Sequence, residues 1–361
     1  MPSPDDDSEV PWVAEPYLRE TILAGMDEAL RAIGKTDGEI DRYFTDTKRE
    51  KLLQYAIVDL NLPLTYSFYL AGGCTVVYST GNLPTREPHL DRPPEPVIET
   101  EFNGDLDPFV ENSLDPKVEQ YKEYFLSELF FGDCTLKEVF HQDKHDFLLD
   151  YYQELLEIDG IHLDEDIIDL YITVTNFRRE LESLTKDLDT TASNTSLTEF
   201  GVDAPGIISR NKELKIRDYV SLIHMKLAGQ EEFNGTLGPV KAGTDLIEKV
   251  VKKLTLQNEV ATKQRQLINE LNDFFYDFVW KYPALRLSIE TATGPNADKI
   301  ISKHQETFAD FDDKLLVETA RFEADLREAG MVPDVEDYID NEYQEAREEI
   351  HRLTRSVVRD E

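Results

Sequence analysis

Apolar residues recur at alternating spacings of three and four through much of the C-terminal part of the chain. Such spacing places the apolar side chains along one face of an α-helix. From Asp245 to Tyr282 the series runs for about five heptads with a polar or small centre. Its members are Ile247, Val250, Leu254, Gln257, Ala261, Gln264, Ile268, Leu271, Phe275, Phe278 and Tyr282. The series predicts one helix of about 38 residues, roughly 57 Å long at 1.5 Å per residue, with Pro283 just past its end.

Two further segments repeat this pattern, one from Asn296 to Ala329 and one from about Val335 onward. Their apolar residues are Ile301, Phe308, Phe311, Leu315, Phe322 and Leu326 in the first, and Ile339, Tyr343, Ala346, Ile350, Leu353 and Val357 in the second. Pro and Gly mark the connections between the helices. Residues 207–361 therefore predict a long antiparallel helical hairpin or three-helix bundle, within a mainly α fold.

The N-terminal part predicts a small α+β domain over residues 15–80. A first amphipathic helix ends at Gly34, and a second begins at Thr45 or Thr47. Its inward-facing residues are predicted to be Leu52, Leu53, Ala56 and Leu60. The apolar and aromatic run of residues 66–80 follows, predicted to form a helix or strand up to Gly72–Gly73 and then a short β-strand.

The middle of the chain predicts a helical domain between two linkers. Seven of the 17 prolines lie in residues 81–116, which predicts an extended acidic linker after a disordered lead at residues 1–14. Helices are predicted over residues 117–131, 136–158 and 164–186. Residues 187–206 are rich in Ser, Thr, Asn and Gly and predict a second linker.

The charge of the chain points to a particular environment. Its 74 acidic and 38 basic residues give a net charge of −36, which costs folding free energy by self-repulsion unless salt screens it. The acids are spread along nearly every segment, so a halophilic cytoplasm is a better interpretation than a nucleic-acid mimic. Residues 66–80 fall short of the roughly 20 residues that span a membrane, and two cysteines fit a reducing cytosol.

Candidate metal ligands occur in two places. His141 and His145 are four residues apart on a predicted helix, near Glu138, while Glu348 and His351 repeat the Glu-x-x-His spacing that di-iron bundles use. Glu is so common in this chain that such a spacing is expected by chance. The sequence therefore favours no metal site and no cofactor, and keeps these five residues as weak candidates.

Catalytic motifs of the common families are missing from the sequence. There is no P-loop, no Gly-x-Gly-x-x-Gly and no Gly-x-Ser-x-Gly. Cys74 follows a Gly-Gly pair, but a reactive thiolate needs a cationic neighbour, and the sequence indicates none. A packed structural cysteine is the simpler interpretation.

One stretch departs from the acidic background. The stretch from Arg210 to Arg265 contains eleven Lys or Arg and only seven Asp or Glu. A basic patch on an acidic protein predicts contact with something negative, either nucleic acid or the acidic face of another protein. The alternative is that these cations pair with neighbouring acids, as Glu248 and Lys252 would at a spacing of four. The partner-binding candidates are Arg210, Lys212, Lys215, Arg217, Lys249, Lys252, Lys253, Lys263 and Arg265.

Residues 48–73, with the sequence KREKLLQYAIVDLNLPLTYSFYLAGG, resemble the start of a winged-helix-like domain. They are similar to SocA-type (Panacea) antitoxin domains and to uncharacterised haloarchaeal proteins. Those families carry Gly-Pro-Val after the aromatic run, where this chain has Gly-Gly-Cys-Thr-Val. The resemblance covers under a tenth of the chain and implies a regulatory or binding module.

The sequence as a whole favours a non-enzymatic interaction or regulatory protein that self-associates or docks a protein partner through its long helices. A nucleic-acid-binding regulator that uses residues 210–265 and the N-terminal domain is the first alternative. A metal-dependent enzyme at His141, with His145 or the Glu348/His351 pair, is the second.

Overall fold

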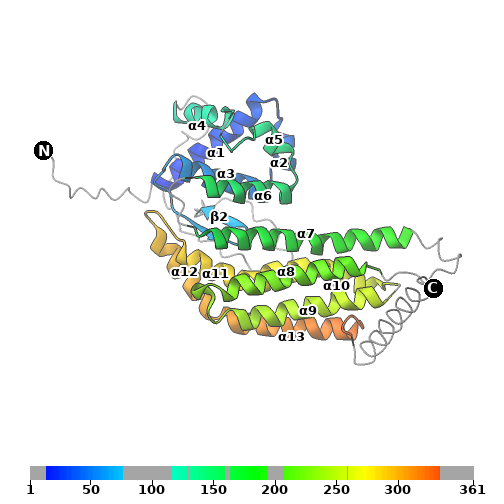
Figure 1. The fold of residues 1–361 in the computed structure, drawn as a ribbon. Helices are drawn as coiled ribbons and strands as arrows, with labels where there is room; N and C mark the ends of the chain where they lie inside the picture. Colours follow the sequence, from blue (N-terminus) through cyan, green and yellow to red (C-terminus); the bar gives the residue numbers. More distant parts are fainter. Residues whose placement is uncertain are drawn as a thin grey trace, which may run out of the picture. The chain divides into compact units, whose positions relative to one another are not determined.

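The computed structural model describes residues 14–75, 116–128, 130–158, 163–193, 207–257 and 259–333 (Figure 1). The chain divides into two compact units, each assembled from segments far apart in the sequence. Unit 1 comprises residues 1–176, 226–234 and 280–311, and unit 2 comprises residues 177–225, 235–279 and 312–361. The predicted mainly α fold is confirmed, since the described residues are helical apart from loops and one two-stranded sheet.

Unit 1 holds the N-terminal helices and the sheet. Its helices are α1 (Ala14–Ala32), α2 (Asp37–Tyr43), α3 (Asp46–Asp59), α4 (Pro116–Leu126), α5 (Leu136–His141), α6 (Lys144–Glu157), the first part of α7 (Glu165–Ser193), the 3₁₀ turn η3 (Glu231–Phe233), α11 (Lys281–Glu290) and α12 (Ala297–Ala309). α1 packs closely against α4, where an added Cβ at Gly25 would lie 2.5 Å from the Cβ of Tyr121. Glycine at this position therefore sets the separation of the two helices.

The sheet of unit 1 is an antiparallel hairpin of β1 (Tyr66–Tyr69) and β2 (Gly72–Thr75). Its register pairs Ser67 with Cys74 and Tyr69 with Gly72. Gly72 has a φ of +91°, which an L side chain rarely adopts, so the turn requires glycine there. The predicted strand up to Gly72–Gly73 is corrected by this register, because the turn comes earlier and both glycines belong to β2.

Helices of unit 1 satisfy the polar groups of the buried hairpin. Trp280 Nε1 donates to the carbonyl of Leu70 at 2.6 Å, and the Tyr171 hydroxyl donates to that of Tyr69 at 2.7 Å. Both donors come from positions far along the chain, and both side chains are about 1% exposed. The apolarity of this run therefore reflects its place in the core of unit 1.

Unit 2 is built from long helices (Figure 1). It contains the remainder of α7, most of α8 (Arg210–Ala228), α9 (Leu237–Leu256), α10 (Thr262–Phe274), most of the π-helical segment η4 (Phe275–Trp280) and nearly all of α13 (Phe311–Glu328). Aromatic contacts fill its core, with Phe177 against Phe275 at 4.6 Å and Phe274 against Phe322 at 4.7 Å between ring centroids. These pairs tie α7 to η4 and α10 to α13.

The single helix predicted for residues 245–282 is wrong. Gln257 is extended between α9 and α10, and Gln264 Oε1 accepts from the backbone N–H of Ala261 to cap the new helix. The break falls at the polar or small centre of the series, where no large apolar side chain holds the helix in the core. Pro283 does not end the helix, because the helical backbone continues from π-helical η4 through Trp280 into α11, whose third residue is Pro283.

Two other predicted helices are also divided. Residues 136–158 form α5 and α6, and Asp143 caps the second by accepting from the N–H of His145. Residues 296–329 form α12 and α13, with a break at Asp310. The sequence analysis missed α2, whose capping box joins Thr36 and Glu39.

Leu60, predicted to face inward, is 38% exposed, because α3 ends one residue before it. The predicted domain boundaries follow the chain, whereas the units combine distant segments. Most of the predicted lead at 1–14 and of the predicted linker at 81–116 lies outside the described residues, as does the helix after Val335. Ala14 and Pro116 are already the first residues of α1 and α4. The linker predicted at 187–206 is wrong in its first part, because α7 continues to Ser193.

Candidate docking site

α8 presents an apolar row on its outer face. Its inner face carries Ile216 and Ile223, which are at most 1% exposed. On the outer face Leu214, Leu222 and Met225 are 42%, 38% and 62% exposed. Their spacings of eight and three place them on one side of the helix. We call this row the α8 stripe.

Large exposed apolar side chains are arranged differently in the two units. In unit 1 those described are Tyr43, Leu60, Leu126 and Leu156, each on a different segment. In unit 2 they gather on two helices, as the α8 stripe and as Leu316 with Val317 on α13. Scattered single side chains need no explanation, whereas grouped ones mark interaction surfaces.

The nine predicted partner-binding residues all lie in unit 2, on α8, α9 and α10. Several contact acids from other helices of the unit. Lys215 Nζ lies 2.5 Å from Glu180 of α7, and Lys263 Nζ lies 3.0 Å from Glu328 of α13. The hydrogen bond to Glu180 raises the pKa of Lys215. These pairs join neighbouring helices across the surface of the bundle.

Lys252 contacts the buried carboxylate of Glu213. Its Nζ lies 3.8 Å from Glu213 Oε1, and Glu213 is 2% exposed. The expected pair of Glu248 with Lys252 is replaced, because Arg217 Nε lies 4.0 Å from Glu248. Burial raises the pKa of Glu248, and Arg217 partly opposes this effect. The interpretation that these cations pair with acids is therefore supported for Lys215, Arg217, Lys252 and Lys263. Their partners lie on other helices and not at a spacing of four along the same helix.

Three exposed cations flank the α8 stripe: Arg210, Lys215 and Arg217. Arg210 and Arg217 lie along one side of the row and Lys215 along the other, at helical spacing. Asp218 lies within the row, four residues from both Leu214 and Leu222, and is the exposed acid of the same face. The stripe with its three cations is the candidate docking site.

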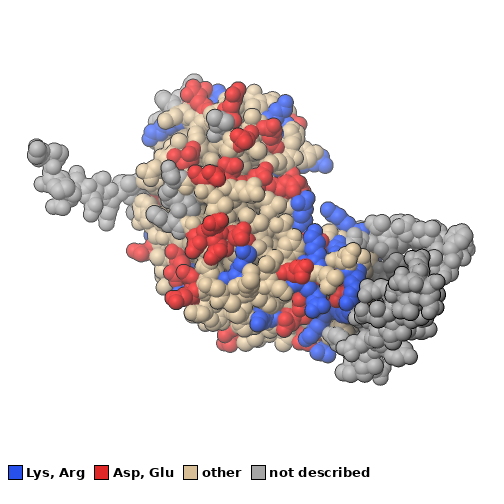
Figure 2. All heavy atoms as spheres, viewed as in Figure 1, with Lys and Arg blue, Asp and Glu red and all other residues tan. Residues whose placement is uncertain are grey.

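The ratio of acidic to basic residues differs between the two units. Figure 2 shows Lys and Arg gathered over part of unit 2, and Asp and Glu over much of the rest of that face. In the described residues of unit 1, 30 acids stand against 16 basic residues, and in those of unit 2, 18 stand against 16. The basic bias predicted for residues 210–265 thus belongs to a unit that is close to neutral in its described part.

The described metal candidates, Glu138, His141 and His145, form no group that could hold a metal ion. His141 ends α5, where its Nε2 lies 2.8 Å from Lys35 Nζ, and His145 is 6% exposed on α6. The Glu138 carboxylate accepts from the N–H and hydroxyl of Thr135 in a capping box, which lowers its pKa. Among the described residues no group of three His, Cys, Asp or Glu is placed to hold a metal ion. Glu348 and His351 lie outside the described residues.

A chain of polar side chains runs from the hairpin to α12 inside unit 1. Ser67 Oγ lies 3.7 Å from Cys74 Sγ and 2.7 Å from Ser288 Oγ, which lies 2.6 Å from His304 Nδ1. Burial lowers the pKa of His304 to about 4, and Lys281 adds to this effect. Both serines are 0% exposed, so a substrate could not reach them without local opening. The chain ties the hairpin to α11 and α12.

The structure brings a cation to Cys74 that the sequence did not indicate. Lys51 Nζ donates to the carbonyl of Gly73, and Lys51 is 4% exposed. Burial lowers the pKa of Lys51, while the neighbouring Cys74 and Glu50 raise it. The sequence contained a signal for this contact. Lys48, Lys51 and Tyr55 are spaced by three and four residues, so both lysines lie on the buried face of α3.

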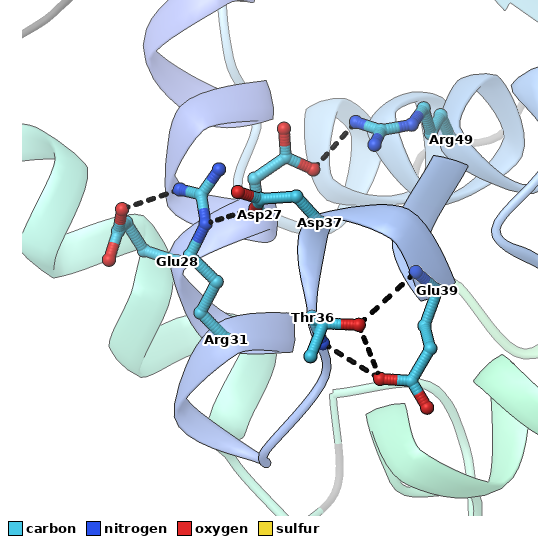
Figure 3. Close-up of polar contacts among 7 residues, drawn as sticks. All are labelled: Asp27, Glu28, Arg31, Thr36, Asp37, Glu39 and Arg49. Carbon is cyan, nitrogen blue, oxygen red and sulfur yellow. Dashed lines mark hydrogen bonds and ion pairs between the residues drawn. The ribbon is translucent and has the colours of Figure 1, made fainter. Parts of the chain in front are cut away.

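Polar residues also cluster at the surface where α1 meets α2 (Figure 3). Arg31 bridges Glu28 and Asp37 at 2.7 and 2.9 Å, and Arg49 Nη1 lies 2.6 Å from Asp27. Burial raises the pKa of Asp27, against the effect of Arg49. The Arg31–Asp37 pair joins α1 to α2 and the Arg49–Asp27 pair joins α3 to α1, while Glu28 and Arg31 pair within α1, so the cluster fixes the helix junction.

The fold and its surface define a class: a mainly helical protein with a buried hairpin in one unit and a layer of long helices in the other. The chain belongs to the DUF8098 family, described as a domain of unknown function, which it matches over residues 13–359. No curated protein and no solved structure matches the chain. Within the described residues, every helix is too short or too polar to cross a membrane.

Proposed function

We propose that this protein is a non-catalytic interaction protein whose α8 stripe docks an acidic amphipathic helix of a protein partner. The observation that carries the proposal is the row of Leu214, Leu222 and Met225 on the outer face of one helix. An apolar row of this length matches the anchors of a partner helix at spacings of three, four and seven.

The charges beside the row favour an acidic partner. Arg210, Lys215 and Arg217 would face carboxylates on both sides of the docked helix. Complementary charges of this kind fix the register and speed association more than they add affinity. On a chain with a net charge of −36, a site for an acidic partner needs such local cations to offset the general repulsion.

The same site suits nucleic acid less well. Several of its cations contact carboxylates, as Lys215 contacts Glu180 and Arg217 contacts Glu248. An acidic helix and a phosphate backbone would both have to displace those carboxylates, but only the helix would also gain apolar contacts with the three exposed side chains. Phosphate affinity also falls steeply with salt.

A pair of designed peptides tests the proposal. Both carry the same apolar heptad positions, and one has Glu where the other has Lys at the flanking positions. Fluorescence anisotropy with the full chain should show saturable binding of the Glu peptide and much weaker binding of the Lys peptide. A labelled DNA duplex serves as a third probe.

Two double variants locate the binding. Leu222→Glu with Met225→Glu should abolish binding of the Glu peptide, while the matched change Leu316→Glu with Val317→Glu on α13 should leave it unchanged. Circular dichroism verifies that both variants fold. Binding that survives the α8 variant, equal binding of both peptides, or binding of DNA alone would overturn the proposal.

The environment is part of the same proposal. We infer a salt-rich cytoplasm, supported by the surplus of acids that unit 1 carries among its described residues. Concentrated salt screens that repulsion and strengthens apolar contacts such as those of the α8 stripe. The likeness of residues 48–73 to winged-helix-like domains stays a prediction, supported by the hairpin that follows α3.

A further inference from the structure

The segment just before α8 and the end of the described chain both contact Gln257. Gln257 accepts at its carbonyl from the N–H of Ile207, just before α8, at 3.0 Å. Its Nε2 lies 3.8 Å from Met331 Sδ. Met331 is 0% exposed, and Gln264 Nε2 donates to the carbonyl of Ala329 at 2.8 Å, so this end of α13 is anchored. The described chain therefore ends, at Pro333, close to the N-terminal end of α8.

The sequence after Pro333 has the chemistry that the α8 stripe was proposed to bind. Residues 334–361 contain ten acidic residues against four basic ones. Their apolar residues fall at helical spacing: Ile339, Tyr343, Ala346, Ile350, Leu353 and Val357. This spacing predicts an acidic amphipathic helix.

The lengths agree. At 1.5 Å per residue, a helix over residues 335–357 would extend roughly 33 Å. The stretch of α8 from Arg210 to Met225 is roughly 23 Å long on the same basis. A segment that begins at the N-terminal end of α8 can therefore reach every side chain of the α8 stripe.

We propose that residues 334–361 are an intramolecular ligand of the α8 stripe, covering it until an acidic partner helix displaces them. The inference rests on the docking function proposed above and adds its regulation. A tethered ligand competes at a high effective concentration, so a partner must bind more tightly than the segment to displace it. The acids of the segment would face Arg210, Lys215 and Arg217, as those of a partner would.

Native methionines allow a test on the full chain. Met225 is the methionine of the α8 stripe, while Met26 and Met331 are both 0% exposed and serve as internal controls for folding. Brief peroxide treatment followed by mass spectrometry reports the oxidation rate of each methionine. Two variants disrupt the segment: one replaces Ile339, Ile350 and Leu353 with Ser, and the other replaces Glu345, Glu348 and Glu349 with Lys.

The expected result is that Met225 oxidises at least about fivefold faster in both variants than in the unchanged chain, while Met26 and Met331 stay protected. The Glu peptide should bind both variants about tenfold more tightly, since its competitor is removed. Equal Met225 rates in all three proteins would overturn the inference.

The peptide separates the two proposals. If the peptide binds all three proteins equally, the docking function stands and the intramolecular ligand is ruled out. If it binds none of them while Met225 is protected by the unchanged segment, the α8 stripe serves the segment alone, and the proposed partner docking fails.

Discussion

The two units use polar side chains in opposite ways. Unit 1 buries a hairpin, and its helices supply the donors that the hairpin carbonyls require, as Trp280 does for Leu70. The described part of unit 2 contains no sheet, and its helices satisfy their own backbones. Unit 2 can therefore keep its cations at the surface beside an apolar row. A buried sheet demands polar partners inside the unit, whereas a helical layer satisfies its own backbone and leaves its polar side chains to pair at the surface, as Lys215 does with Glu180.

The charges show the same difference. Among the described residues, unit 1 has nearly two acids for each basic residue, 30 against 16, while unit 2 is close to balance at 18 against 16. Solvation of a folded protein in salt requires acids spread over the surface. Recognition of an acidic helix requires cations in one place. The proposed salt adaptation draws on unit 1, and the proposed docking draws on unit 2.

The largest effect is expected for Lys48→Met in unit 1. Lys48 Nζ donates to the carbonyls of Val139, Phe140 and Gln142 at 2.8 to 3.1 Å, and it is 3% exposed. Loss of this donor leaves the C-terminal carbonyls of α5 unsatisfied, which should lower the free energy of unfolding by about 3 kcal/mol.

Chemical denaturation measures this change. The control is Lys137→Met on the exposed side of α5, which should change stability by less than about 0.5 kcal/mol. Equal effects of the two substitutions would show that unit 1 does not depend on buried polar donors, and the contrast between the units would lose its main support.

The second largest effect is a loss of folding stability at low pH, which depends on His304. Burial lowers the pKa of His304 to about 4, from an unfolded value of about 6.5. The unfolded state therefore binds more protons between these values, so stability is lost as the pH falls through this window. The loss from His304 should reach about 2 kcal/mol between pH 7 and pH 5. Lys281, Lys303 and the ring of Tyr69 face this histidine and offer no carboxylate to oppose the effect.

Stability measured against pH in the wild type and in His304→Gln isolates this contribution. His224 of unit 2 is the comparison: burial also lowers its pKa, but it is only half-buried, and its Nε2 lies 2.8 Å from Thr244 Oγ1. His224→Gln should remove less of the pH dependence. A steeper loss from His224→Gln would reverse the assignment.

The smallest effects compare helix contacts. Gly25→Ala in unit 1 would place a Cβ 2.5 Å from the Cβ of Tyr121 and 3.0 Å from backbone atoms of α4. The cost should be about 1.5 kcal/mol. Gly243→Ala in unit 2 meets Val279 Cγ2 at 2.4 Å, and the three nearest atoms all belong to this side chain rather than to the backbone, so a smaller cost of about 1 kcal/mol is expected.

Gly238→Ala is the control, because nothing lies within 4 Å of its added Cβ and alanine favours the helix. It should stabilise the protein slightly. Thermal or chemical denaturation of the three variants ranks them, and a larger cost at Gly243 than at Gly25 would show that unit 2 is the more rigidly packed unit.

Local patterns predicted much of the secondary structure. Thr45 was predicted as a possible helix cap and accepts from the N–H of Lys48, and Gly34 follows α1 with a φ of +87°. The breaks at Gln257–Ala261 and Asp310 were not predicted, because three- and four-residue spacing continues across both and a period does not show where a helix turns. The cationic neighbour of Cys74 was missed because Lys51 belongs to another element.

The helical class, the acidic character and the basic bias of residues 210–265 could be predicted from the chain alone, since they depend on periodicity and composition. The packing of the helices was needed to show which cations contact carboxylates, as Lys252 does with Glu213. It alone showed that Leu214, Leu222 and Met225 face outward while their neighbours are buried. Helical spacing gives two faces to a helix such as α8, and only the helices packed around it decide which of them meets solvent.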